Sequence, residues 1–229
     1  VALQEKIWGA GVGETVPACV LQVSQEVGGV AAGAFAPTGE LVGFVFGLTG
    51  VRDGKLAHWS HLLAVDEEWR DRGIGGLLKS FQREALLSMG VHSMLWTFDP
   101  LESRNAHLNL NTLGATVEKY VPDFYGTNSG AKTDTVIGTD RFIVHWDLTD
   151  AQVQSTSRDL LLSDIPCATN RPQSGVSPEM IENPSPSGGF VRIEIPANIQ
   201  ALKSSDPTSA AAWRETTRSA FSQFLGAGY

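Results

Sequence analysis

A run of glycines between a strand-like segment and an amphipathic segment constrains this chain more than any other feature. The stretch "LLAVDEEWRDRGIGGLL" spans residues 62–78, and Gly73, Gly75 and Gly76 follow its apolar start. The residues after it have apolar side chains at helical spacing as far as Met89. A strand that enters a glycine turn and then a helix presents free backbone N–H groups at the positive end of the helix dipole. The stretch therefore predicts a phosphate-binding site.

Two common nucleotide-binding motifs do not fit this stretch. The P-loop pattern requires a Lys followed by Ser or Thr at the end of the loop, and "GIGGLL" has neither. The dinucleotide fingerprint requires glycine or alanine where this chain has Leu78. Arg70 and Arg72 would still add positive charge beside an anion. The sequence thus favours a phosphate ligand of another kind.

The remaining patterns predict a mixed α/β layout. Residues 30–50 read as an antiparallel hairpin with a turn at "PTGE", and residues 58–65 read as a third strand. Further expected strands span residues 93–99, 115–121 and 140–148, and expected helices span residues 1–8, 13–29 (with Thr15 as N-cap), 77–89 and 102–114. In the third helix, Leu77 and Phe81 are expected in the core and Lys79 and Gln82 in solvent.

The last third of the chain has a different character. Residues 150–189 are rich in Ser, Pro, Asn and Asp, and we expect a long surface loop or insertion there. Residues 190–229 contain a predicted strand, "FVRIEIP", and a helix with Trp213, Phe221 and Leu225 on one face. We expect this extension to pack on a core formed by residues 1–149, because the helix would otherwise expose a large apolar patch.

Charge and cysteine content exclude several classes of protein. The 229 residues carry a net charge of −8, which argues against a nucleic-acid partner. No apolar run reaches the ~20 residues of a membrane helix, and no signal peptide opens the chain, so we expect a cytoplasmic protein. Cys19 and Cys167 stand far apart without a ligand pattern, which disfavours a metal site and leaves a disulfide open. The initial Val indicates a fragment.

The glycine stretch closely resembles the acetyl-CoA signature of the GNAT superfamily of N-acetyltransferases. Arg70, Gly73 and Gly75 stand on the signature positions, after a strand with an aliphatic end and a short acidic linker. The resemblance covers residues 1–148 in the family's order of elements, and the block at residues 96–115 resembles a bacterial subgroup of predicted acetyltransferases. It implies a mixed, mostly antiparallel sheet flanked by helices (α+β), with residues 150–229 as a C-terminal extension.

The resemblance also implies a place for acetyl-CoA. Its pyrophosphate would bind the loop amides, and its pantetheine would pair with the backbone of the signature strand, which should diverge from the next strand. The Val65 N–H would stabilise the thioester oxyanion. The implied cofactor-binding residues are Leu63, Val65, Arg70, Arg72, Gly73, Ile74, Gly75, Gly76, Asn105 and Asn109.

The catalytic side chains that many members of the family carry are missing here. Leu110 stands where many members carry a Tyr as general acid, so Tyr125 is the candidate acid, although an aromatic loop residue also suits packing. His61 is the candidate base, with His58 as a weaker one, and a strand histidine also suits a packed role. Asp99 would either attract a cationic substrate or cap the turn at Pro100.

Three functions remain open on this basis. The first is direct acetyl transfer from acetyl-CoA to an amine of a small molecule or peptide, without a metal. The second is a non-catalytic acyl-CoA-binding or regulatory module, which the missing Tyr favours. The third is a role in assembly through the C-terminal helix, and a homodimer is one option within it.

Overall fold

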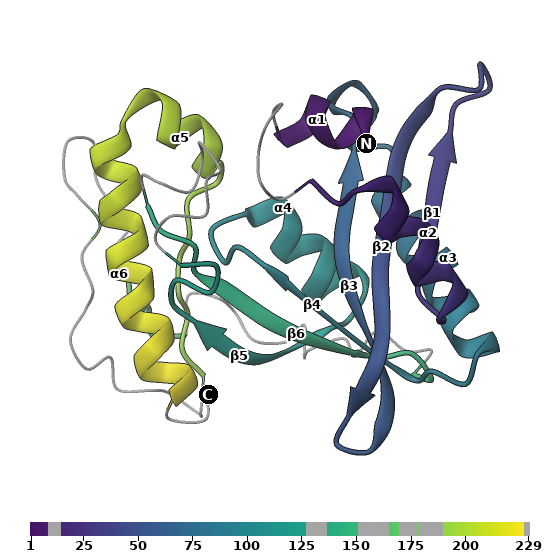
Figure 1. The fold of residues 1–229 in the computed structure, drawn as a ribbon. Coiled ribbons are helices and arrows are strands. Elements are labelled where there is room, and N and C mark those ends of the chain that lie inside the picture. Colours follow the sequence, from purple (N-terminus) through teal and green to yellow (C-terminus); the bar gives the residue numbers. More distant parts are fainter. Residues whose placement is uncertain (9–14, 127–136, 151–164, 170–177, 179–189, 227–229) are drawn as a thin grey trace. The chain divides into compact units, whose positions relative to one another are not determined.

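The computed structural model describes residues 1–8, 15–126, 137–150, 165–169, 178 and 190–226 (Figure 1). The elements up to the glycine loop are α1 (Ala2–Trp8), α2 (Ala18–Glu26), β1 (Val30–Phe35), β2 (Leu41–Arg52), β3 (Lys55–Val65) and the 3-10 helix η1 (Glu67–Trp69). The later elements are α3 (Ile74–Ser88), β4 (Ser93–Phe98), α4 (Ser103–Ala106), the π-helix η2 (His107–Thr112), β5 (Thr116–Val121), β6 (Arg141–Asp147), α5 (Ile199–Ser205) and α6 (Pro207–Gly226). None of these described helices combines the length and hydropathy needed to cross a membrane.

The strands form one sheet in the order β1-β2-β3-β4-β6-β5. The β1–β2 and β2–β3 pairs are antiparallel, whereas β3 and β4 are parallel. The long β2–β3 hairpin (Figure 1) turns at Asp53 and Gly54, which both have the positive φ angles that a tight hairpin turn requires. The predicted fold class, a mixed and mostly antiparallel sheet with flanking helices, is confirmed.

The chain divides into two compact units. The first contains residues 1–97, 112–116 and 144–153, and the second contains residues 98–111, 117–143 and 154–229. In the first unit, successive residues of β2 face opposite sides of the sheet. Phe44 meets Trp8 of α1 edge-on, with ring centroids 6.0 Å apart. A β-carbon on Gly43 would contact Ile74 and Leu78 of α3, so α1 and α3 cover opposite faces of this part of the sheet.

The orientation of α3 differs from the prediction. Leu77 and Phe81, expected in the core, are 69% and 54% exposed, whereas Lys79 and Gln82 are buried. The expected assignment of the solvent-exposed and buried faces of α3 was wrong. The helix carries apolar residues all round, and its polar pair finds hydrogen-bond partners on β3 that make burial possible.

Three further elements differ in detail. The second helix starts at Ala18, with Pro17 rather than Thr15 at the N-cap. The predicted helix over residues 102–114 is split into α4 and the π-helix η2. The predicted strand "FVRIEIP" makes an isolated parallel bridge, Cys167 with Arg192, and is not part of the sheet. The expected loop over residues 150–189 lies mostly outside the described residues, and the boundary at residue 150 stays a prediction.

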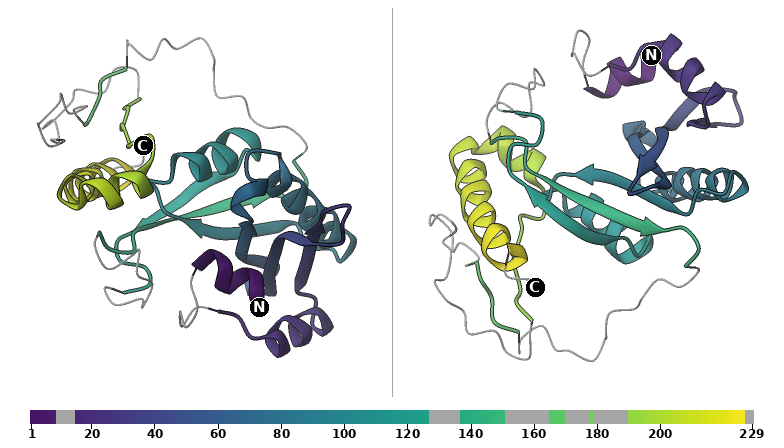
Figure 2. Two further views of the ribbon diagram at one scale, coloured as in Figure 1. Left: turned by 90° about the horizontal axis from the view of Figure 1, so that it is seen from above. Right: turned by 60° about the horizontal axis from the view of Figure 1, so that its bottom comes forward.

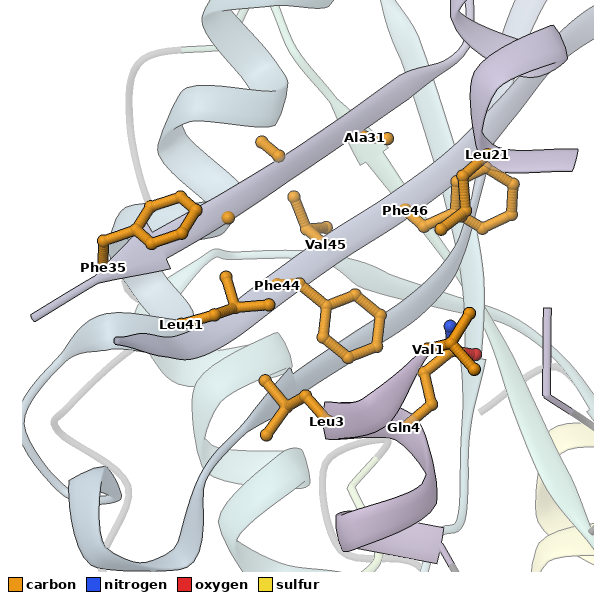
Figure 3. Close-up of a pocket in the computed structure, with 12 residues that line it drawn as sticks. Val1, Leu3, Gln4, Leu21, Ala31, Phe35, Leu41, Phe44, Val45 and Phe46 are labelled. Atoms are coloured by element: carbon orange, nitrogen blue, oxygen red, sulfur yellow. The ribbon is translucent and has the colours of Figure 1, made fainter. Parts of the chain in front are cut away.

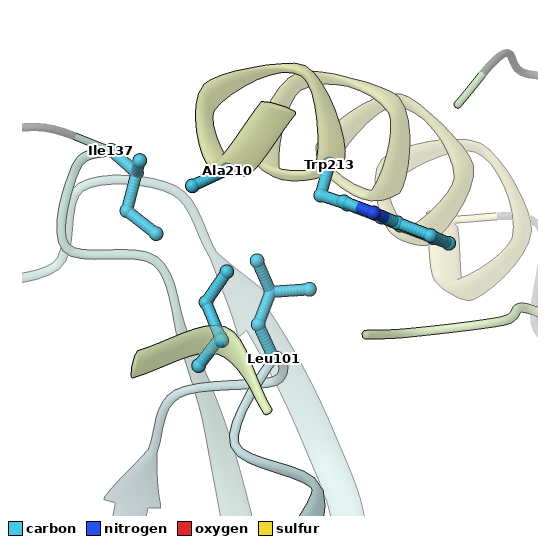
Figure 4. Close-up of a cluster of buried hydrophobic side chains, with 5 residues drawn as sticks. Leu101, Ile137, Ala210 and Trp213 are labelled. Atoms are coloured by element: carbon cyan, nitrogen blue, oxygen red, sulfur yellow. The ribbon is translucent and has the colours of Figure 1, made fainter. Parts of the chain in front are cut away.

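The second unit is organised around α6 (Figure 2). Trp213 and Ala210 of α6 pack with Leu101, Ile137 and Ile199 of α5 in one buried cluster (Figure 4). A second cluster joins Ala220 and Phe224 of the same helix to Ala168, with Val191 and Ile193 packed against it. The helix thus buries its apolar face within its own chain, against residues from several earlier segments that reach back to Leu101.

Buried ion pairs add to this packing. Arg214 binds Asp99 at 2.6 Å and donates through Nε to the Ile137 carbonyl at 3.1 Å. Arg218 pairs with the buried Asp140 and with Asp123, and the Tyr120 hydroxyl donates to Asp140. Burial alone would raise the pKa of Asp140, but the hydrogen bonds from Arg218 and Tyr120 hold that pKa below its usual 3.8. The C-terminal helix therefore neutralises two buried carboxylates.

A chain that ends at Asp150 should fail to fold cooperatively. Such a chain lacks α5 and α6, so Leu101 and Ile137 become exposed. Asp99 then lacks its partner Arg214, and Asp140 lacks its partner Arg218. Removing one partner of a buried pair costs about 3–5 kcal/mol, and the loss of the partly exposed Arg218 costs less than the loss of the buried Arg214. We expect aggregation in size-exclusion chromatography and a broad thermal transition, whereas a control ending at Leu225 should behave as the full chain. A soluble and fully active shortened chain would contradict this role of the extension.

Candidate functional site

The glycine loop leads directly from β3 into α3. Asp66, the first residue after β3, accepts a hydrogen bond from the Glu68 N–H and starts η1, and it pairs with Lys6 of α1. Gly73 stands at the N-cap of α3 with φ of 77°, a left-handed conformation that favours glycine. Sequence reasoning did not assign Asp66 this anchoring role, although its position after a strand is typical of such a cap.

The first turn of α3 has the geometry of an anion site. The first N–H that bonds within the helix belongs to Leu77, which donates to the Gly73 carbonyl at 3.1 Å. The preceding N–H groups of Ile74, Gly75 and Gly76 therefore point out of the helix end. A β-carbon on Gly76 would meet nothing within 4 Å, so the approach to these groups is open on the protein side. This arrangement suits a phosphate oxygen at the positive end of the helix.

The two arginines of the loop are held beside the helix end. Arg70 donates through Nε to the Val65 carbonyl at 3.4 Å and lies 3.9 Å from Glu67. The Arg72 guanidinium stacks on the Trp69 ring, 4.7 Å from its centroid. Both cations are thus held against the turn that leads into α3. There they add local positive charge, although the protein as a whole has a negative net charge.

The strands β3 and β4 form a fork. Their parallel pairing consists of two residue pairs, His58 with Met94 and Trp59 with Leu95. The register of β2 against β3 shifts just beyond, between Phe46 and Gly47, so that His61 is the extra residue of a β-bulge. A bulge bends and twists its strand, which explains why β3 leaves β4 at this point.

The part of β3 beyond the fork offers backbone groups to a ligand. The Asp66 N–H donates to the carbonyl of Val42 on β2, at 2.8 Å. Because peptide groups alternate along a strand, those of Leu63 and Val65 point to the other edge, toward the open side of the fork. An extended chain with amide groups could pair there as an added strand.

His61 lies on the bulge, close to this edge. Its ring meets Phe46 of β2 edge-on, with centroids 6.2 Å apart, and burial lowers its pKa below the usual 6.5. His58, by contrast, is fully buried, and burial together with the charge of Lys79 lowers its pKa to about 4. Of the two histidines, His61 is the one that a substrate could reach.

An apolar pocket of about 240 Å³ lies on the face of β1 and β2 that α1 covers (Figure 3). Its walls come from the two N-terminal helices and the β1–β2 hairpin, and they include Leu3, Leu21, Phe44 and Phe46. Phe46 lines the pocket, and its ring is also the one that meets His61. Phe46 thus links the pocket to the candidate base, which is not itself part of the pocket wall.

A chain of buried hydrogen bonds runs behind the fork, on the side of α3. Lys79 Nζ donates to Ser60 Oγ at 2.7 Å, and Ser60 Oγ donates to Gln82 Oε1 at 2.8 Å. Gln82 Nε2 then donates to His58 Nε2 at 3.0 Å.

The same chain continues to the edge of α2. With Nε2 accepting, His58 carries its proton on Nδ1 and donates to Thr49 Oγ1 at 2.9 Å, which donates to the Gly28 carbonyl. A β-carbon on Gly47 would stand 2.1 Å from His58 Nε2, so only glycine fits at that position. Sequence reasoning missed this cluster, although polar residues at alternate positions of a central strand, His58 and Ser60, could have signalled it.

The other predicted site residues belong to the second unit. Asn105 is exposed on α4, and Asn109 is buried in η2. Tyr125 stacks edge-on with Phe124 at 4.8 Å and lies under the Arg141 guanidinium, 5.2 Å from its ring centroid. Asp99 accepts from the Leu101 N–H and pairs with Arg214, which corresponds to the capping alternative. The described thiols, Cys19 and Cys167, are free.

Comparison with solved structures identifies the fold. No protein-family model and no curated protein matches the chain. The crystal structure of the NatC complex bound to Gag peptide and CoA matches with a TM-score of 0.50 and 16% identity, over 65% of this chain and 90% of that chain. Looser matches include an aminoglycoside 6'-acetyltransferase type Ii (TM-score 0.49, 17% identity, 66% and 88% covered). Another is a GNAT family acetyltransferase from Elizabethkingia anophelis with acetyl-CoA bound. Its TM-score is 0.43 and its identity 15%, over 59% of this chain and 92% of that chain. Together with the order of its elements, the first of these matches shows that the chain has the fold of the GNAT acetyltransferases.

Proposed function

We propose that this chain is an N-acetyltransferase that moves the acetyl group of acetyl-CoA directly to an amine of a small molecule or peptide. The observation that carries the proposal is the fork between β3 and β4 beside a glycine-rich helix N-terminus. The NatC complex, whose fold this chain shares, binds CoA and a peptide. That precedent supports a CoA ester and an amine acceptor as the pair of substrates.

The residues that we propose to hold the cofactor all belong to the first unit. The pyrophosphate would accept hydrogen bonds from the N–H groups of Ile74, Gly75 and Gly76, with Arg70 and Arg72 as nearby cations. The pantetheine amides would pair with the edge of β3 that faces the fork, at Leu63 and Val65, where the Val65 carbonyl also accepts from Arg70. This arrangement brings the thioester to the apex of the fork, near the β-bulge at His61.

The transfer itself needs few groups. The neutral amine attacks the thioester carbonyl carbon, an N–H on the open edge of β3 stabilises the resulting oxyanion, and the C–S bond breaks to release the CoA thiolate. Leu63 lies nearer than the predicted Val65 to the β-bulge at His61, so its N–H is the donor closer to the apex of the fork. His61 takes the proton that the amine loses, directly or through a water molecule. Tyr125 stays a candidate for the acid that protonates the thiolate. Neither β3 nor β4 carries a cysteine, so the acetyl group has no thiol nucleophile on the fork strands.

The apolar pocket suggests what kind of amine is accepted. Its wall shares Phe46 with the ring contact of His61, so an acceptor whose amine meets His61 could place its carbon skeleton against Phe44 and Leu21. We therefore expect amines with an aliphatic or aromatic group to react faster than small polar amines. A panel of such amines, assayed by release of free thiol from acetyl-CoA, tests both the activity and this preference. Binding of acetyl-CoA without thiol release would instead indicate a non-catalytic module.

Replacing the proposed base should affect the rate and not cofactor binding. We expect His61→Ala to lower kcat/KM by about 100-fold while the affinity for acetyl-CoA stays unchanged. Because burial lowers the pKa of His61, the pH–rate profile of the wild type should contain a limb that rises at a pH below 6.5 and that is absent from His61→Ala, in addition to the rise that follows the pKa of the acceptor amine. The exposed His92 supplies the matched control, His92→Ala. An unchanged rate and pH profile in His61→Ala would show that His61 only packs against Phe46.

A further inference from the structure

Lys79 occupies an unusual place for a lysine. Its side chain is on the sheet side of α3, and the residue is 1% exposed. Nζ lies 2.7 Å from Ser60 Oγ, 3.7 Å from Met94 Sδ and 3.8 Å from the centroid of the Trp96 ring. Among the described residues, no carboxylate forms an ion pair with it. A buried ammonium without an anion is costly, so this position needs an explanation.

The amine stands behind the apex of the fork. Ser60 is the residue of β3 that follows the last pair with β4, and Trp96 is the residue of β4 in the same position. Lys79 Nζ contacts both. The group is therefore next to the point where the proposed thioester would enter, but it is reached only through the protein interior.

The same helix also carries the proposed pyrophosphate site. Lys79 follows Gly75 by four residues, so its Cα is roughly 6 Å further along the α3 axis. With the phosphates beyond the first turn, the helix rise alone puts their two negative charges on the order of 10 Å from Nζ. Across a poorly screening interior, charges at that distance raise the pKa of an ammonium by on the order of one to two pH units.

We propose that Lys79 is the buried counter-charge of the bound cofactor, and that the protein takes up a proton at Lys79 Nζ when acetyl-CoA binds. The inference rests on the proposed function, because it needs acetyl-CoA at the glycine loop. The contacts of Nζ suit both protonation states. The ammonium gains the face of Trp96 as a cation–π partner, and the neutral amine retains its hydrogen bond to Ser60.

Other groups around Nζ keep their charge over the relevant pH range. Desolvation lowers the pKa of Lys79 to about 7, whereas the pKa of His58, which β3 contributes, is lowered to about 4. On α3 itself, the Arg83 guanidinium donates to the Leu148 carbonyl. Met94 and Trp96 of β4 do not titrate. Between pH 6.5 and 9.5, Lys79 is therefore the member of this cluster whose charge can change.

Calorimetry of acetyl-CoA binding tests the inference. Titrations at pH 7.5 in buffers of different ionisation enthalpy report the number of protons exchanged. For the wild type we expect an uptake of about half to three quarters of a proton per acetyl-CoA. Lys79→Met, which keeps an unbranched side chain one atom shorter and without charge, should abolish this uptake. Lys55→Met, at an exposed position, should leave it unchanged.

The pH dependence of affinity supplies an independent measurement on the unaltered protein. A ligand that favours the protonated lysine binds more tightly as pH falls, so the Kd for acetyl-CoA should decrease about 10-fold or more from pH 9.5 to 6.5. A flat profile, or equal proton uptake by the wild type and Lys79→Met, would overturn the inference and leave the proposed function intact. Absence of any acetyl-CoA binding would overturn both.

Discussion

Lys79→Met should stabilise the protein at pH 6, and the gain should shrink by on the order of 4 kcal/mol between pH 6 and pH 10. Burial lowers the pKa of Lys79 from its usual 10.5 to about 7 in the folded state. Between these two values the unfolded chain holds a proton that the folded chain does not, so stability rises with pH across that window. Below pH 7 the folded protein carries a buried, unpaired ammonium, which methionine removes.

Urea unfolding of the wild type and of Lys79→Met at pH 6, 8 and 10 measures this effect. The contributions of the other titrating groups cancel when the two free energies of unfolding are subtracted. Lys55→Met serves as the control, because Lys55 is exposed at the start of β3 and its replacement should give no pH-dependent difference. A difference between Lys79→Met and the wild type that is constant with pH would mean that Lys79 keeps an ordinary pKa in the folded protein.

Gly76→Val should abolish measurable binding of acetyl-CoA while the fold remains. The change adds a branched side chain at the end of α3, where a β-carbon meets nothing in the protein but would occupy the approach to the helix N–H groups. We expect the Kd to rise by 100-fold or more, because the pyrophosphate loses several charge-assisted hydrogen bonds. Isothermal titration calorimetry gives the affinity, and circular dichroism reports whether the fold is kept.

Gly50→Val is the matched control for this prediction. Gly50 lies on β2, a β-carbon there also meets nothing within 4 Å, and valine is compatible with a strand. The control should bind acetyl-CoA as the wild type does. Unaltered affinity in a folded Gly76→Val protein would remove the glycine loop from the proposed cofactor site.

Local signals account for what the sequence predicted well. The glycines of the loop, the turn of the first hairpin and the spacing of apolar residues in the strands all act over a few residues, and each is seen in the fold. The fork between β3 and β4 was expected from the family resemblance, and the pairing of only His58 and Trp59 of β3 confirms the divergence.

Interactions between distant segments account for what was missed. The sequence of α3 has apolar residues on every side, so spacing alone could not show that Lys79 faces the sheet and Phe81 faces solvent. The sequence left a substrate anchor open as one interpretation of Asp99, because the partner Arg214 comes 115 positions later. The roles of Asn105 and Tyr125 depend on bound substrate and stay predictions.

The hydrogen-bond chain from Lys79 to the Gly28 carbonyl has one further consequence. Each of its members donates in the same direction, so reversing any one link would leave two lone pairs or two protons facing each other. His58 is therefore locked in the single tautomer that keeps its proton on Nδ1. A buried hydrogen-bond chain with a single direction of donation has one preferred arrangement of protons. The His58 imidazole should therefore give one sharp pair of nitrogen resonances in NMR rather than an average of two tautomers.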